Sequence, residues 1–176
     1  MKNREPLFLR FINKEVGVSD LLSTFARSGD PYTAETATAA MGNPPNLDEF
    51  LLEITEATRD IIRSGIGDEF KAFVNHYMMD SIAEDIESGD TPQGQNISRT
   101  ARVRDADTPW VQGLLCYNLC LYVKAYGLQD LKICKICNKF FAHKGQYALY
   151  CSDACKKQGK AEKKPQEPTA LPPMMP

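Results

Sequence analysis

Four of the six cysteines in this 176-residue chain lie in two close pairs near its C-terminal end. They are Cys134, Cys137, Cys151 and Cys155, with the spacing C-x2-C-x13-C-x3-C. A C-x2-C step lets a tight turn aim two sulfurs at one ion, and zinc prefers four tetrahedral ligands, for which thiolates are well suited. The spacing therefore predicts one Zn²⁺ held by all four cysteines.

Two disulfides, buried free thiols and an iron–sulfur cluster are the alternatives to zinc. The N-terminal stretch MKNREPLFLRFINKE has only a brief apolar run and no small-residue cleavage site, so we expect a cytoplasmic protein. Thiols stay reduced in that compartment, which disfavours disulfides. The 13 residues between the pairs suit a small hairpin, and CSDACKKQGKAEKK is typical of a helix start capped by Ser152. A hairpin followed by a helix favours zinc over an iron–sulfur cluster.

These features predict a mainly α fold in three parts. Residues 1–130 form a helical domain, residues 131–164 form a small treble-clef-like four-cysteine zinc finger with a short β-hairpin and a helix, and the proline-rich residues 165–176 form a disordered tail. There is no stretch of about 20 apolar residues, so we expect no membrane partner.

Helical spacing of apolar residues is clearest in four segments of the N-terminal part: 20–27, 46–64, 68–87 and 108–126. The last segment is apolar on nearly all sides, which predicts a central core helix opened by Thr108 and Pro109. Residues 6–16 read as a short strand or buried extended segment. The polar stretch 88–107 reads as a loop in which ISRTARVR could be an exposed strand, and the pattern leaves the connector 28–45 undecided.

Charge divides the chain unevenly. Residues 1–130 carry 12 Lys and Arg against 20 Asp and Glu, a balance of −8, whereas residues 131–164 carry nine lysines against two acidic residues, a balance of +7. A basic module of this kind suggests contact with phosphate groups. The lysines that we expect to make this contact are Lys135, Lys139, Lys144, Lys156, Lys157 and Lys160, with Arg99, Arg102 and Arg104 as a second basic strip. The alternative is an ordinary solvated charged surface.

Other residues in or near the finger are more easily explained by packing. His143 lies beside a complete set of thiols, so we expect it at the surface or around the ligands rather than on the metal. Of the aromatic residues between the pairs, at least two should form a core and the others could stack on bases. Cys116 and Cys120 have apolar neighbours and no further ligand, which predicts two buried packing residues. The aromatic residues are Phe140, Phe141, Tyr147 and Tyr150.

The stretch LKICKICNKFF, with LYCSDAC further on, resembles the finger of the CGNR zinc-finger proteins over residues 131–156. In that bacterial family a helical N-terminal domain precedes a C-terminal four-cysteine finger, and the proteins are regarded as transcription regulators. The FLRFIN start fits the same layout. After the last cysteine this chain reads KKQ instead of Gly-Asn-Arg, and it lacks the family's arginine-rich stretch. Similar fingers also occur in uncharacterised bacterial and prophage-borne proteins.

No phosphate-binding glycine loop, G-x-S-x-G or H-E-x-x-H motif occurs, and four thiolates leave zinc no open position, so we expect no enzyme. The sequence favours a nucleic-acid-binding transcription regulator with a structural Zn²⁺. Because lysine outnumbers arginine in the finger, we expect backbone contacts rather than base readout. The alternative is a protein-interaction module, in which the finger is a structural cap and its basic face meets an acidic partner or the chain's own acidic part.

Overall fold

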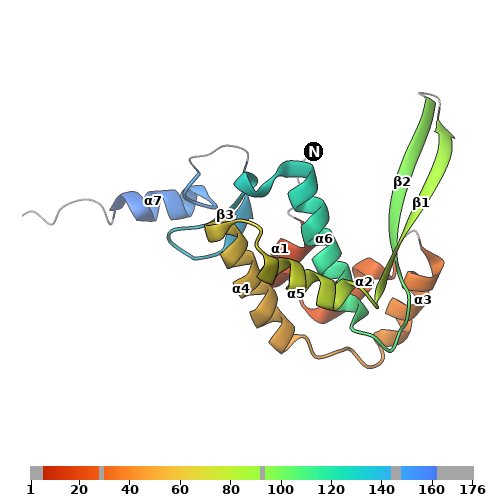
Figure 1. The fold of residues 1–176 in the computed structure, drawn as a ribbon. Helices are drawn as coiled ribbons and strands as arrows, with labels where there is room; N and C mark the ends of the chain where they lie inside the picture. Colours follow the sequence, from red (N-terminus) through yellow and green to blue (C-terminus); the bar gives the residue numbers. More distant parts are fainter. Residues whose placement is uncertain (1–5, 28–29, 92–93, 144–147, 162–176) are drawn as a thin grey trace, which may run out of the picture.

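The structure, a computed structural model, describes residues 6–27, 30–91, 94–143 and 148–161, with the backbone alone at residues 84–91, 94–100 and 126. Figure 1 shows a cluster of helices with a two-stranded ribbon projecting from one end and a hairpin and helix at the other. The predicted mainly α class with a small C-terminal hairpin-and-helix unit is confirmed. The elements are α1 (Leu7–Ile12), α2 (Val18–Phe25), α3 (Pro31–Ala40), α4 (Asp48–Ser64), α5 (Asp68–Met78), β1 (Ile82–Thr91), β2 (Gly94–Val103), α6 (Trp110–Tyr126), the 3-10 turn η1 (Leu128–Asp130), β3 (Leu131–Ile133), β4 (Phe140–Ala142) and α7 (Asp153–Ala161).

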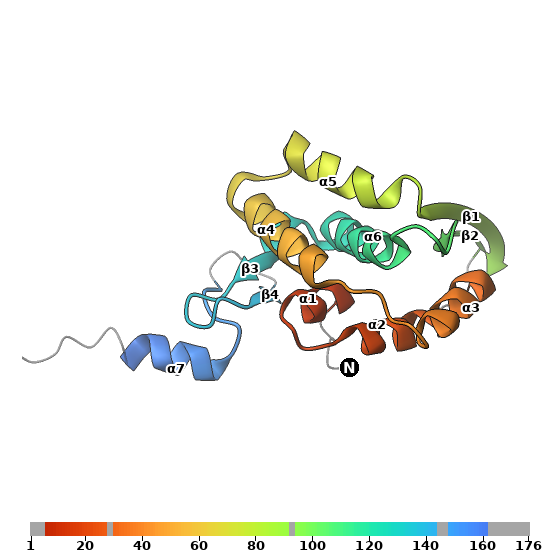
Figure 2. The ribbon, with the colours of Figure 1, turned by 90° about the horizontal axis from the view of Figure 1, so that it is seen from below.

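Helix α6 lies at the centre of the helical cluster, with α5 on one side and α1 on the other (Figure 2). Its residues Val111, Leu115, Cys116 and Leu119 are almost completely buried, and they face several neighbouring helices. A helix surrounded on all sides needs apolar residues all round, which is the pattern seen in its sequence. The predicted central core helix is therefore confirmed.

The two ends of α6 differ in how well the sequence predicts them. Thr108 does not cap the helix, because its Oγ1 donates a hydrogen bond to the carbonyl of Asp105 at 2.7 Å. The helix begins at Trp110, with Pro109 in the N-cap position, one residue later than predicted. Gly127 ends it as predicted, with a φ of +81° that glycine adopts without strain.

Residues 7–12 form the helix α1, so the predicted strand over residues 6–16 is wrong. Phe8, Leu9, Phe11 and Ile12 are all buried. Side chains at these positions share one side of a helix, whereas a strand would turn alternate residues away from the core. The chain leaves the helix through Lys14, which has a φ of +58°.

Helix α5 ends at Met78, so the predicted helix over residues 68–87 is too long. The chain instead enters β1, which pairs with β2 in an antiparallel register along the full length of both strands. Ile82 and Val103 face each other at the base of this ribbon, and both are buried. The alternative interpretation of ISRTARVR as a strand is confirmed for the backbone.

Short polar side chains lie at the starts of two other N-terminal helices, although only α3 has a side-chain cap in the N-cap position. Asp30 accepts a hydrogen bond from the Thr33 N–H at 2.7 Å, and it opens α3 in the connector that the sequence pattern leaves undecided. Asn46 accepts one from the Asp48 N–H at 2.9 Å at the start of α4. None of the described helices has the length and apolar character that a bilayer-spanning helix requires.

Candidate metal centre

The first cysteine pair lies in the turn that joins β3 to β4. The Cys134 N–H donates to the carbonyl of Lys139 at 2.9 Å, and the Asn138 N–H donates to the carbonyl of Cys134 at 3.0 Å. Asn138 has a φ of +57°, a left-handed conformation that asparagine tolerates better than most residues. The two strands therefore flank the first pair, whereas the sequence predicts a hairpin between the two pairs.

The second pair is carried by the start of α7. The Ser152 Oγ accepts a hydrogen bond from the Cys155 N–H at 3.3 Å, which confirms Ser152 as the helix cap. The segment before this pair is tied to the turn of the first pair, because the Lys135 N–H donates to the carbonyl of Leu149 at 3.0 Å. Gly159 of α7 is buried against Tyr150, where a Cβ would lie only 2.7 Å from the tyrosine ring. This close approach holds α7 against the loop that leads into it.

The four sulfurs form one cluster. All lie within 4.8 Å of one another, and Cys151 Sγ is 3.5 Å from Cys137 Sγ and 3.7 Å from Cys155 Sγ. A tetrahedron of sulfurs about 2.3 Å from zinc has edges of about 3.8 Å, close to these separations. A disulfide would instead need sulfurs about 2.05 Å apart. The cluster is thus compatible with a metal ion, and zinc is a plausible one.

The backbone around the first pair favours negative charge on Cys134. Burial raises the pKa of this thiol, but hydrogen bonds from the backbone of Cys137, Cys151 and Ile136 outweigh burial and hold the pKa at about 6. Burial, together with hydrogen bonds with the neighbouring cysteines, raises the pKa of Cys151 to about 12. A metal cation bound here would lower this pKa, so the thiol would lose its proton to solvent. Backbone donors to Cys134 would also offset the charge of a four-thiolate zinc complex.

The hairpin is packed into the core of the helical part. Leu131 and Phe140 are each only 2% exposed, and they belong to the same buried cluster as the helices. The Asn13 side chain at the end of α1 exchanges two hydrogen bonds with the backbone of Phe140. The guanidinium of Arg59 on α4 lies 5.8 Å from the centre of the Phe140 ring, within range of a cation–π contact. Asn13 and Arg59 carry no local sequence signal that links them to the finger.

Lys139, one of the predicted phosphate contacts, is paired within the chain. Its Nζ lies 3.0 Å from a carboxylate oxygen of Glu15, which lies between α1 and α2. This hydrogen bond and the negative charge raise the pKa of Lys139. The pair is an instance of the alternative that the sequence leaves open, a contact between the basic finger and the chain's own acidic part.

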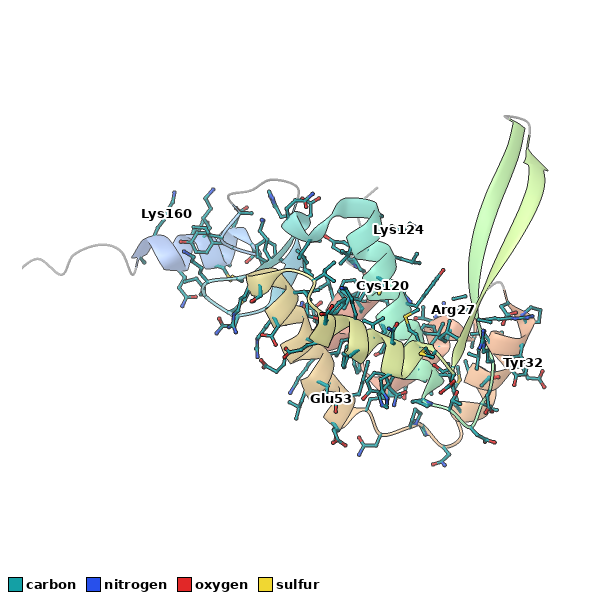
Figure 3. All side chains as sticks on the ribbon, viewed as in Figure 1. Arg27, Tyr32, Glu53, Cys120, Lys124 and Lys160 are labelled. Carbon is teal, nitrogen blue, oxygen red and sulfur yellow. The ribbon has the colours of Figure 1, made fainter. Side chains whose placement is uncertain are left out.

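The other predicted lysines differ in their surroundings. Lys156, Lys157 and Lys160 are exposed on α7, and none forms an ion pair within the part of the chain that the structure describes. Figure 3 labels Lys160 on this helix, which extends away from the helical cluster. Lys135 is exposed in the turn of the first cysteine pair, and Lys144 lies outside the described residues.

The second basic strip is not brought near the finger. Arg99 and Arg102 belong to β2, in the ribbon at the opposite end of the structure from α7 (Figure 1). Arg104 follows β2, and its guanidinium donates to the carbonyl of Met79 at 3.4 Å. Of the Arg99 side chain the structure describes nothing. The two basic regions therefore do not form one surface.

The remaining residues near the cysteines behave largely as predicted. Phe140 and Phe141 are buried, although Phe140 packs in the core of the helical part rather than in a separate finger core. His143 is exposed and is not part of the sulfur cluster. Tyr147 lies outside the described residues.

Cys116 and Cys120 pack in or against the core, away from the sulfur cluster, as predicted. Burial raises the pKa of the Cys116 thiol well above its usual range, and it raises that of Cys120 as well. Both thiols therefore stay protonated at neutral pH, as packing residues do.

Neither a scan against protein-family models nor a search of curated proteins found a match to this sequence. Function therefore has to be inferred from the chemistry of the site.

Proposed function

We propose that this chain is a cytoplasmic zinc-finger protein in which a structural Zn²⁺ fixes α7 to the end of a helical body, and that α7 contacts nucleic acid in a transcription regulator. The observation that carries the proposal is the set of exposed lysines on α7, next to the cysteine cluster and without ion-pair partners among the described residues. These lysines are Lys156, Lys157 and Lys160.

The role of the metal is structural. Zinc with four protein ligands keeps no open coordination position, so it neither activates water nor polarises a substrate. It would instead join the turn that carries Cys134 and Cys137 to the start of α7, because each contributes two ligands. The likeness to the CGNR finger supports this arrangement of a helical part followed by a four-cysteine finger. We therefore propose no catalytic activity.

Contact through phosphates fits the chemistry of α7. Lysine is a compact point charge on a flexible stem, which suits a phosphate oxygen but does not give the bidentate recognition of guanine that arginine provides. After the last cysteine the chain reads KKQ, whereas the CGNR family has Gly-Asn-Arg. The arginine of that family motif is therefore missing from this chain. We therefore propose binding with weak dependence on base sequence.

The protein-interaction alternative is favoured by one observation, the docking of the hairpin on the helical part. One face of the finger, which carries β4, is covered by the helical part: Lys139 pairs there with Glu15, and Phe140 is buried. This face acts as a structural cap, and α7 remains available for a partner. The structural cap and the proposed nucleic-acid contact thus use different faces of the finger. Lys139 lies on the cap face, so we do not propose it as a nucleic-acid contact.

The test is binding of the full, zinc-loaded chain to duplex DNA over a range of salt concentrations. The double substitution Lys156→Glu/Lys157→Glu should weaken binding to all sequences and flatten the log–log salt slope by roughly 1.8, about 0.9 for each phosphate that a lysine no longer neutralises. Lys71→Glu, which makes the same kind of charge change on α5, is the control and should leave the slope unchanged. If the wild-type chain binds neither duplex DNA nor single-stranded DNA or RNA at low salt, the protein-interaction function replaces this one.

A further inference from the structure

A groove lies between α5 and α6, away from the cysteine cluster. Its volume is ≈ 560 Å³, within the range of small-molecule sites. The apolar part of its lining comes from Ile66, Phe70, Val74, Cys120 and Val123. Ile66 is 48% exposed, so its apolar surface is accessible to a ligand.

Two lysines border this apolar surface. Lys71 of α5 and Lys124 of α6 both line the groove (Figure 3 labels Cys120 and Lys124). Residues 1–130 have a balance of −8, so the two lysines place positive charge beside this apolar surface in an otherwise acidic segment. The Lys71 Nζ forms an ion pair with the Asp68 carboxylate, 2.8 Å from its Oδ1. Lys124 has no ion-pair partner in the described part of the chain.

The size of the groove favours a small molecule over a partner helix. The lining residues span 70–75 on α5 and 120–124 on α6. Six helical residues extend over roughly 8 Å, about a turn and a half. A docked amphipathic helix needs anchors at i, i+3, i+4 and i+7, which is a longer surface than these walls offer.

We propose that this groove binds a small amphipathic carboxylate, with its hydrocarbon chain on the apolar floor and its carboxylate beside Lys124 and Lys71. The exposed amide of Asn75 also lines the groove and offers a further donor. The floor is uncharged, because burial raises the pKa of Cys120 and keeps its thiol protonated. This inference does not depend on the proposed nucleic-acid binding.

Octanoate, whose extended hydrocarbon chain is about as long as these walls, is the probe, measured by calorimetry on the full, zinc-loaded chain below the concentration at which the probe forms micelles. Lys124→Glu and Lys71→Glu should each weaken binding by about tenfold, since each removes a charge-assisted contact and adds repulsion. Both side chains are exposed, so these variants should fold. Lys14→Glu, the same change at a lysine outside this groove, is the matched control and should bind like the wild type.

Two further probes test the two halves of the proposed ligand. Hexanoate, shorter by two methylene groups, should bind roughly tenfold more weakly than octanoate if the hydrocarbon chain lies on the floor. Octylamine, with the opposite charge, should not bind detectably. The proposal is overturned if octanoate does not bind, if Lys14→Glu weakens binding as much as Lys124→Glu does, or if octylamine binds as tightly as octanoate.

Discussion

Asn13 and Phe140 lie 127 residues apart in the sequence and exchange two hydrogen bonds. The Asn13 Nδ2 donates to the carbonyl of Phe140 at 2.7 Å, and the Phe140 N–H donates to the Asn13 Oδ1 at 2.9 Å. One side-chain amide thus pairs with both backbone groups of a residue in β4. This bridge joins the end of α1 to the hairpin that carries the first cysteine pair, so metal binding and core folding should be coupled.

Replacing Asn13 tests the bridge. Asn13→Ala leaves the N–H and carbonyl of Phe140 without their partners in a partly buried place, so we expect a loss of about 2–4 kcal/mol in the free energy of unfolding. Denaturant titration of the zinc-loaded chain measures this loss. Asn75→Ala is the control, since Asn75 is exposed and its side chain makes no hydrogen bond within the described residues. Equal stability of the two variants would contradict the structural role of the bridge.

Removing the metal should weaken the helical part as well as the finger. Leu131 and Phe140 are buried in the common core, so loosening the hairpin exposes part of that core. We expect Cys137→Ser, or treatment with a chelator, to lower the melting temperature followed by the helical circular dichroism signal by about 5 °C or more. A helical transition that does not shift would indicate a finger that folds independently, as the sequence alone predicts.

The Glu15–Lys139 pair should restrain Lys139 from contacting phosphate. Both side chains are partly exposed, so the pair itself contributes little to stability. Glu15→Gln removes the negative charge and leaves Lys139 available. Because a further lysine can then neutralise a phosphate, the salt slope of binding should steepen by about 0.9. The double variant Glu15→Gln/Lys139→Gln should show the wild-type salt slope. If its slope is as steep as that of Glu15→Gln, Lys139 is not the cause of the steeper slope.

Cys116 and Cys120 should make no contribution to metal binding. Replacing both with Ala should leave the zinc content unchanged, since the four clustered sulfurs belong to other residues. The free energy of unfolding should fall by about 1–2 kcal/mol because packing is weakened, mainly at the buried Cys116. Metal analysis together with denaturant titration checks both parts, and loss of zinc from the double variant would overturn the assignment of the ligands.

The features that the sequence predicts well depend on neighbouring residues. Cys134 and Cys137 share one tight turn, Cys151 directly precedes the cap of α7, and Cys155 lies in the first turn of that helix. These short spacings determine which sulfurs can meet. The cap at Ser152 and the all-round apolar character of α6 are likewise local. Such features are visible in a single sequence because few distant contacts affect them.

The features that the sequence does not predict depend on distant partners. Residues 82–87 continue the helical pattern of α5, but pairing with β2 places them in a strand. The short apolar run of α1 fits a strand as well as a helix, and only its packing against α6 and α4 reveals which side is buried. Likewise nothing near Asn13 or Glu15 indicates that their partners, Phe140 and Lys139, lie at the other end of the chain. A prediction of the finger as a separate unit could not include these contacts.

The central claim, one zinc ion held by four cysteines, is tested most directly by metal analysis of the purified full-length chain during titration with a thiol-modifying reagent. We expect about one zinc per chain, released as the clustered thiols are modified, and no release from a variant in which Cys134, Cys137, Cys151 and Cys155 are all replaced by Ser. A chain that contains no metal under reducing conditions, or that contains iron with visible absorbance, would contradict the assignment.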